Sequence, residues 1–169
     1  MARFEIDPTA SQVWIHGSSS VHPIEATAAG LAGWVEVSLT RAGAPAASPS
    51  LAGEVRIAVD RLGSGNPLVD AETRRRVDAR RHPEIVGTVS SATRSSTGAL
   101  AVAGEIAFRG EVRDVAGELS VGARDGRLVV EGEQTFDVRD WGLKLPWLGL
   151  LRVHPDVRVR IHVEAVPAG

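Results

Sequence analysis

The stretch VRVRIHVEAV, residues 157–166, alternates between apolar and polar side chains as far as Glu164. A period of two matches the geometry of a β-strand, in which successive side chains point to opposite faces of the sheet. The alternation therefore predicts a strand with one face against a core and the other in water. The apolar face holds Val157, Val159, Ile161 and Val163, and the polar face holds Arg158, Arg160, His162 and Glu164.

The same period recurs along most of the chain, between short runs of Gly, Ser and Asp that mark turns. Strands of this kind, about eight in all, form either a closed barrel or a two-sheet sandwich. Closure removes the exposed strand edges that promote aggregation, so we expect an all-β fold, an antiparallel eight-stranded β-barrel. The further predicted strands lie at 11–17, 33–39, 54–62, 83–92, 98–108, 111–121 and 126–138.

One segment has helical spacing instead, and we expect one short helix over 67–81 in a connection between strands. Asn66 suits the N-cap, Pro67 suits the first helical position, and Pro83 ends the pattern. Acidic residues stand four positions before arginines, a spacing that stabilises a helix by about 0.2–0.5 kcal/mol per pair. The expected pairs are Asp70–Arg74 and Glu72–Arg76.

This helical segment is rich in arginine. Five arginines within 74–81 are offset by four acidic residues within 70–84, and the whole chain carries a net charge of −2. Nucleic-acid binding needs a strongly basic face, so no nucleic-acid partner is expected. Two interpretations remain open. The arginines form the solvated face of a helix, or Arg75 and Arg80 meet the anionic head of a ligand, because arginine binds phosphate in a bidentate manner.

The composition is that of a soluble globular protein. With 169 residues, 43% hydrophobic and 24% charged, the chain is expected to form a single domain over 1–169. It has no cysteine, which excludes disulfides and thiolate metal sites. No apolar run approaches the ~20 residues of a membrane span, and residues 1–17 lack the apolar core of a signal peptide. We therefore expect a cytoplasmic protein without stable membrane insertion.

Several stretches, in this order, resemble the YceI-like family of lipocalin-like barrels. They are FEID at 4–7, SSSVH ending at His22, RVDARRHPEI at 76–85, the strand flanked by Gly104 and Gly110, RDWGL at 139–143 and the terminal strand. The resemblance implies a lipocalin-like barrel whose elongated apolar tunnel binds an isoprenoid chain. The ligand would be a polyprenyl diphosphate or an isoprenoid quinone, held for storage or transport. It implies neither catalysis nor a cofactor.

The alternation itself assigns the side chains that face the barrel interior. Bulky fillers are scarce, with three Phe, four Trp and no Tyr, which favours a ligand cavity over a filled core. A filled barrel acting as an interaction or stress-response module is the alternative. The residues expected to line the tunnel are Val35, Val37, Leu100, Val102, Ile106, Phe108, Leu128, Val130 and Phe136.

The tunnel mouth is expected near the segment 140–155, which is crowded with Trp and Leu beside Pro and Gly. This segment either covers a barrel end or forms an apolar rim where a lipid enters, and a homodimer through it is a third possibility. The residues assigned to the mouth are His22, Arg75, Arg80, Trp141 and Trp147. His22 could equally tie a strand to a neighbouring loop.

Motifs for other chemistry are weak. His16 and His22 flank three serines, but a hydrolase needs a base and a third orienting group that the sequence does not supply. The five histidines have no spacing typical of a metal site. We therefore expect a non-catalytic protein without a bound metal, and a small hydrolase is the weakest alternative.

Overall fold

The computed structural model describes residues 1–20, 23–46, 50–143, 147–148 and 151–169. Strands dominate the described chain, with one α-helix and two short 3₁₀-helices among them. In chain order the elements are β1 (Ala2–Ile6), β2 (Gln12–Ser18), β3 (Pro23–Ala29), β4 (Ala32–Val37), β5 (Leu51–Ala58), η1 (Val59–Arg61), α1 (Pro67–Arg76), β6 (Glu84–Arg94), β7 (Leu100–Phe108), β8 (Glu111–Arg124), β9 (Arg127–Asp137), η2 (Val138–Trp141), β10 (Trp147–Leu148), β11 (Leu151–Arg152) and β12 (Asp156–Pro167).

Strand β12 closes the barrel. It pairs with β9 along 156–165 on one side, and with both β2 and β1 on the other, at 158–162 and 165–167. Strands β1 and β2 thus lie end to end along β12, and β4 and β3 pair with them in turn. The ten strands of the main sheet therefore fill eight positions of a closed antiparallel barrel. The expected all-β fold, an eight-stranded barrel with one short helix, is confirmed.

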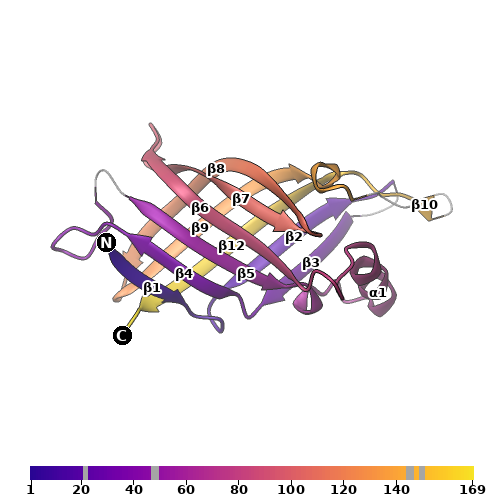
Figure 1. Cartoon of the computed structure of the whole chain (residues 1–169), viewed down its shortest axis with the longest axis horizontal. Helices are drawn as coiled ribbons and strands as arrows, with labels where there is room; N and C mark the ends of the chain where they lie inside the picture. The colour runs from indigo at the N-terminus through magenta and orange to yellow at the C-terminus, as the bar shows by residue number, and fades with distance from the viewer. Residues whose placement is uncertain (21–22, 47–49, 144–146, 149–150) are drawn as a thin grey trace.

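The two ends of the barrel differ. Both chain termini lie at one end, which we call the terminus end, and α1 and β10 lie at the other, the helix end (Figure 1). At the helix end β3 does not pair with β5. A single bridge links Thr27 to Gly63 there, and the segment through η1 lies between the two strands.

The helix is shorter than the sequence predicted, because it ends at Arg76 and not at residue 81. Asp78 takes a left-handed conformation with φ 55°, and its N–H bonds to the carbonyl of Arg75. The N–H of Ala79 bonds to the carbonyl of Arg74, which completes a Schellman motif and reverses the chain. Asn66 caps the other end as expected, accepting from the N–H groups of residues 68 and 69.

The predicted ion pairs of the helix are half correct. Arg76 donates to Glu72 at 2.7 Å, as expected. Asp70 accepts instead from the hydroxyl of Ser64 at 2.7 Å, and Arg74 lies 3.8 Å from Asp60. The loop before the helix offers Asp70 two fixed donors, the hydroxyl and the N–H of Ser64, and these compete with a flexible guanidinium.

The hydrophobic core gathers at the terminus end and extends to the point where β1 passes into β2. Its side chains come from the inward faces of strands that are distant in sequence, so closure of the barrel creates it. The buried cluster consists of Phe4, Ile6, Val13, Ala28, Leu31, Val35, Val37, Leu51, Leu100, Leu128, Val130, Val163 and Ala165.

Candidate functional site

The inward faces of the strands change in burial along the barrel. On β12, Val163 and Ala165 are 2% and 0% exposed, whereas Val157, Val159 and Ile161 are only half-buried. All five point inward, since they share one parity of the same strand. An inward side chain that keeps accessible surface must face space, so the barrel is packed at the terminus end and open toward the helix end.

Other strands repeat this gradient. On β2 Val13 is fully buried and Ile15 half-buried, and on β7 Leu100 is 2% exposed while Val102 is half-buried. On β5 Leu51 is buried and Val55 half-buried. The packed cluster therefore forms the floor of the barrel interior, and the less tightly covered apolar side chains toward the helix end form its open section.

The predicted tunnel-lining residues divide between these two zones. Val35, Val37, Leu100, Leu128 and Val130 belong to the packed floor. The other four lie in the open section, where their side chains face inward and are half-buried: Val102, Ile106, Phe108 and Phe136. Their contact with a ligand stays a prediction.

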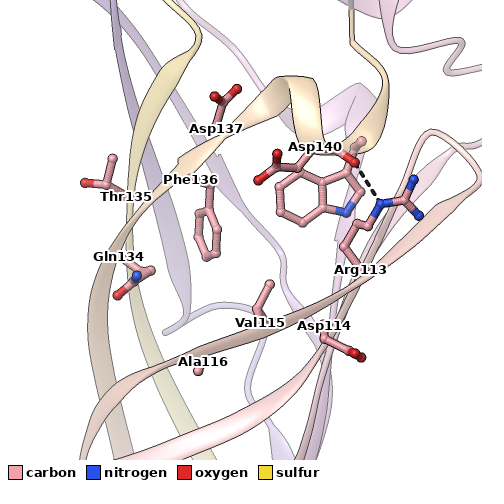
Figure 2. Close-up of a pocket in the computed structure, with 10 residues that line it drawn as sticks. Arg113, Asp114, Val115, Ala116, Gln134, Thr135, Phe136, Asp137 and Asp140 are labelled. Atoms are coloured by element: carbon pink, nitrogen blue, oxygen red, sulfur yellow. Dashed lines mark hydrogen bonds between the residues drawn. The ribbon is translucent and has the colours of Figure 1, made fainter.

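The barrel wall has a gap between two of its strands. Strands β8 and β9 pair only between Leu119–Gly132 and Arg124–Arg127, and toward the helix end they part. A cavity of about 350 Å³ fills the gap, bounded by η2. We call it the β8–β9 window; it is lined by Arg113, Asp114, Val115, Ala116, Gln134, Thr135, Phe136, Asp137, Asp140 and Trp141. Figure 2 shows the ring of Phe136 pointing into this gap.

Residues from both faces of the barrel wall line the window. Val115 pairs with Gly104 of β7, and Phe136 pairs with Val157 of β12, so both belong to the inward faces of their strands. The next residues along each strand, Ala116 and Asp137, belong to the outward faces. The cavity therefore lies within the wall, between the inner and outer faces of the two parted strands.

Trp141 forms the upper edge of the window. It is 4% exposed, and its ring meets that of Phe136 edge to face, with centroids 5.9 Å apart. Arg109 donates to the carbonyl of Trp141 at 3.0 Å and to that of Arg76 at 3.2 Å. These bonds fix η2 against both the barrel end and the end of α1.

Both guanidinium groups of the window region are already engaged. Arg113 donates to the carbonyls of Asp140 and Val112, each at 2.8 Å, and to the carboxylate of Glu111 at 3.0 Å (Figure 2 draws the bond to Asp140). Arg139 donates to Asp137 at 2.7 Å. This guanidinium, with the N–H of Arg139, holds the pKa of the Asp137 carboxyl below its usual range.

Other polar side chains of the window make no such bond. Within the described residues, the side chains of Asp114, Gln134, Thr135 and Asp140 make no hydrogen bond or ion pair with another side chain. The Asp140 carboxylate does lie near enough to Arg139 to interact with its charge. The amide of Gln134 lies over Gly117 of β8, where an added Cβ would stand 3.2 Å from its Oε1. Gly117 thus leaves room for this amide between the parted strands.

No pattern in the sequence predicted the window. The window nevertheless leaves one trace in the sequence. Gln134 occupies an inward position in the series Leu128, Val130, Gly132, Gln134 and Phe136, and it interrupts the apolar face. A polar side chain at an inward position of a barrel strand is the signal that could have located the site.

Three of the five residues predicted for the mouth have described side chains, and their contact with a ligand stays a prediction. Arg75 is 69% exposed and pairs with Glu72 at 2.7 Å, and Arg80 is exposed in the turn after α1. Trp141 lies in the window. His22 and the side chain of Trp147 lie outside the described residues. The pairing of Arg75 favours the interpretation of these arginines as a solvated surface.

The other chemical candidates gain no support. His16 lies 3.2 Å from Glu25 on the outward side of the β2–β3 pair. Across the described residues, no group of three or more His, Asp or Glu side chains is arranged to hold a metal ion. In the same part of the chain, no helix has the length and apolarity to cross a membrane.

The backbone superposes on three solved structures. BcnA of Burkholderia cenocepacia gives a TM-score of 0.79 at 16% identity, covering 95% of this chain and 99% of that one. A polyisoprenoid binding domain from Saccharophagus degradans gives 0.78 at 15%, covering 99% and 100%. The YceI protein of Campylobacter jejuni gives 0.64 at 14%, covering 81% and 82%.

The sequence alone gives no such match. No family model matches it, and no curated protein does. The likeness is one of three-dimensional structure, and the chain has the fold of the YceI-like proteins, as its motifs predicted.

Proposed function

We propose that this barrel binds a long apolar lipid of the isoprenoid class in its open section, without catalysing a reaction on it. The observation that carries the proposal is the gradient of burial along the inward faces, from the fully buried Ala165 to the half-buried Val157 on one strand. It leaves an apolar tunnel with a packed floor and an open end. Such a space suits a chain-like ligand, since each buried CH₂ contributes about 0.8 kcal/mol.

The comparison supports the class of ligand. The solved domain from Saccharophagus degradans is a polyisoprenoid binding domain, and this chain shares its fold over nearly the full length of both. Storage or transport of the lipid is the role that a non-catalytic carrier would serve. The cytoplasmic location and the homodimer expected from the sequence stay predictions.

The direct test is organic extraction of the purified protein, followed by mass spectrometry. The proposal expects a co-purifying isoprenoid lipid, or stoichiometric uptake of geranylgeraniol by the extracted protein. A protein that carries no lipid and takes up none would be a filled-barrel module.

A matched pair of variants locates the binding. Val102 and Ala103 are neighbours on β7, and the first faces the open section while the second is exposed on the outside. Val102→Trp should block uptake of geranylgeraniol at unchanged stability, because the tunnel accommodates the indole. Ala103→Trp should leave uptake unchanged. The contrary result is that Val102→Trp lowers the free energy of unfolding by about 1–3 kcal/mol, the loss typical of adding a large side chain to a packed core. That result would show that the interior is filled, and the proposal would fail.

A further inference from the structure

The β8–β9 window and the tunnel share Phe136 and Val115 in their walls, so one ligand can occupy both. The tunnel is apolar, whereas the window carries carboxylates, an amide and the hydroxyl of Thr135. A cavity of about 350 Å³ exceeds the ~30 Å³ share of one water by an order of magnitude, enough for a polar head group. The apolar tunnel therefore matches the tail of a lipid, and the polar window matches its head group.

The charges of the window decide which head group fits. A phosphate is best held by cationic donors, but the guanidinium groups of Arg113 and Arg139 are already bonded to carbonyl and carboxylate oxygens, and the charge of Arg139 is paired with Asp137. The window side chains left without a hydrogen bond or an ion pair in the described chain are Asp114, Gln134, Thr135 and Asp140, two of which are carboxylates and none of which is a cation. An anionic head would meet the repulsion of a carboxylate, while a hydroxyl would donate to it in a charge-assisted hydrogen bond.

We infer that the β8–β9 window is a head-group subsite that receives an uncharged hydroxyl of the bound lipid, with the Asp140 carboxylate and the Gln134 amide oxygen as its acceptors. This inference rests on the proposed function, since the tail must lie in the tunnel. It assigns the ligand to the isoprenoid alcohols and quinols and excludes the diphosphates. The parted strands β8 and β9 give the head its access to water.

The test compares three probes with one tail: geranylgeraniol, its methyl ether and geranylgeranyl diphosphate. The ether keeps the oxygen and loses the donated proton. The wild-type chain should bind the alcohol about tenfold more tightly than the ether, in keeping with one charge-assisted hydrogen bond. It should bind the diphosphate more weakly than the alcohol at low ionic strength, where charge effects are strongest.

Asp140→Asn should change the affinities for the three probes differently. Affinity for the alcohol should fall several-fold toward that of the ether, affinity for the ether should stay unchanged, and affinity for the diphosphate should rise. Gln134→Leu should lower the affinity for the alcohol and leave the affinities for the other two probes unchanged. Glu118→Gln is the matched control, because Glu118 is an exposed carboxylate on β8 outside the window, and it should change none of the three.

The outcomes separate the inference from the proposed function. If none of the three probes binds, the proposed function fails. If all bind but wild type does not distinguish alcohol from ether, or prefers the diphosphate, the tail site stands and the head-group subsite is refuted. If Asp140→Asn lowers the affinity for all three probes equally, Asp140 only supports the structure. That result would also refute the subsite.

Discussion

The indole N–H of Trp141 donates a hydrogen bond of 2.9 Å to the carbonyl of Ile106. The chain leaves the barrel from β9, and this side chain reaches β7, two strands away in the wall. The bond spans the helix end of β8 and holds η2 over the gap beside it. This bond holds the upper edge of the window together with the bonds that Arg109 and Arg113 donate to the carbonyls of Trp141 and Asp140.

Trp141→Phe should destabilise the protein by about 1–3 kcal/mol, because it removes this part-buried hydrogen bond and leaves unfilled space where the buried indole packs. Urea denaturation measures the change. The control is Trp14→Phe, where Trp14 lies on the outward face with the Arg160 guanidinium 4.1 Å from its ring. That variant should cost less, since phenylalanine keeps a ring under the arginine. Equal losses in the two variants would contradict a special role for the Trp141 bond.

Asn66→Ala should destabilise α1 locally. The Asn66 side chain accepts from two N–H groups of the first turn, and loss of such a cap costs about 1 kcal/mol. Amide exchange across 68–76 should accelerate about fivefold, while exchange in β12 stays unchanged, because the helix lies outside the core. Leu68→Ala, in the same turn and 81% exposed, is the control and should have little effect. Unchanged exchange in Asn66→Ala would show that the cap contributes nothing.

His162 should make part of the stability depend on pH. Its ring nitrogens lie 3.0 Å from Glu164 and 3.4 Å from Glu131, and the hydrogen bond to Glu164, followed by that to Glu131, raises the pKa of His162 above 6.5. A pKa raised by folding means that the contribution is complete below about pH 6.5 and is lost as the pH rises through the folded value. The stability difference between wild type and His162→Gln should therefore shrink from pH 6 to pH 8.

The same titration can be followed directly by NMR of the imidazole. Glu164→Gln should lower the pKa of His162, because a neutral amide replaces the charged carboxylate whose hydrogen bond contributes most to raising that pKa. A pKa at or below 6.5 in the wild-type protein would overturn this prediction. The effect on stability should be modest, since the side chain keeps contact with solvent.

Arg75→Ala/Arg80→Ala should leave the affinity for geranylgeraniol unchanged. Arg75 is engaged with Glu72 on the outer side of α1, and Arg80 is exposed beyond it. Stability should change by less than about 0.5 kcal/mol, as for most surface positions. The critical measurement is the affinity for the diphosphate at low salt, in wild type and in the double variant. A preference for the diphosphate that disappears in this double variant would restore these arginines as head-group ligands.

Local pattern in the sequence was enough to locate most strands and the start of the helix. It failed where the signal is weak or competes with tertiary contacts. Strand β3, with the sequence PIEATAA, is rich in Ala and Thr and shows too little apolar contrast to be recognised. The end of α1 was missed because Asp78 adopts a left-handed conformation that ordinary residues avoid.

What the sequence determined by itself is the alternation of VRVRIHVEAV and its counterparts, because the parity of a strand is a local property of the extended backbone. Strand parity assigned Val157 and Phe136 to the inside without knowledge of any partner strand. Only the tertiary structure decided that β8 and β9 part beyond Leu119 and Gly132, since pairing depends on residues that meet only after the barrel has closed. Gln134, Asp140 and Trp141 become one site for that reason: they lie at the place where the wall opens.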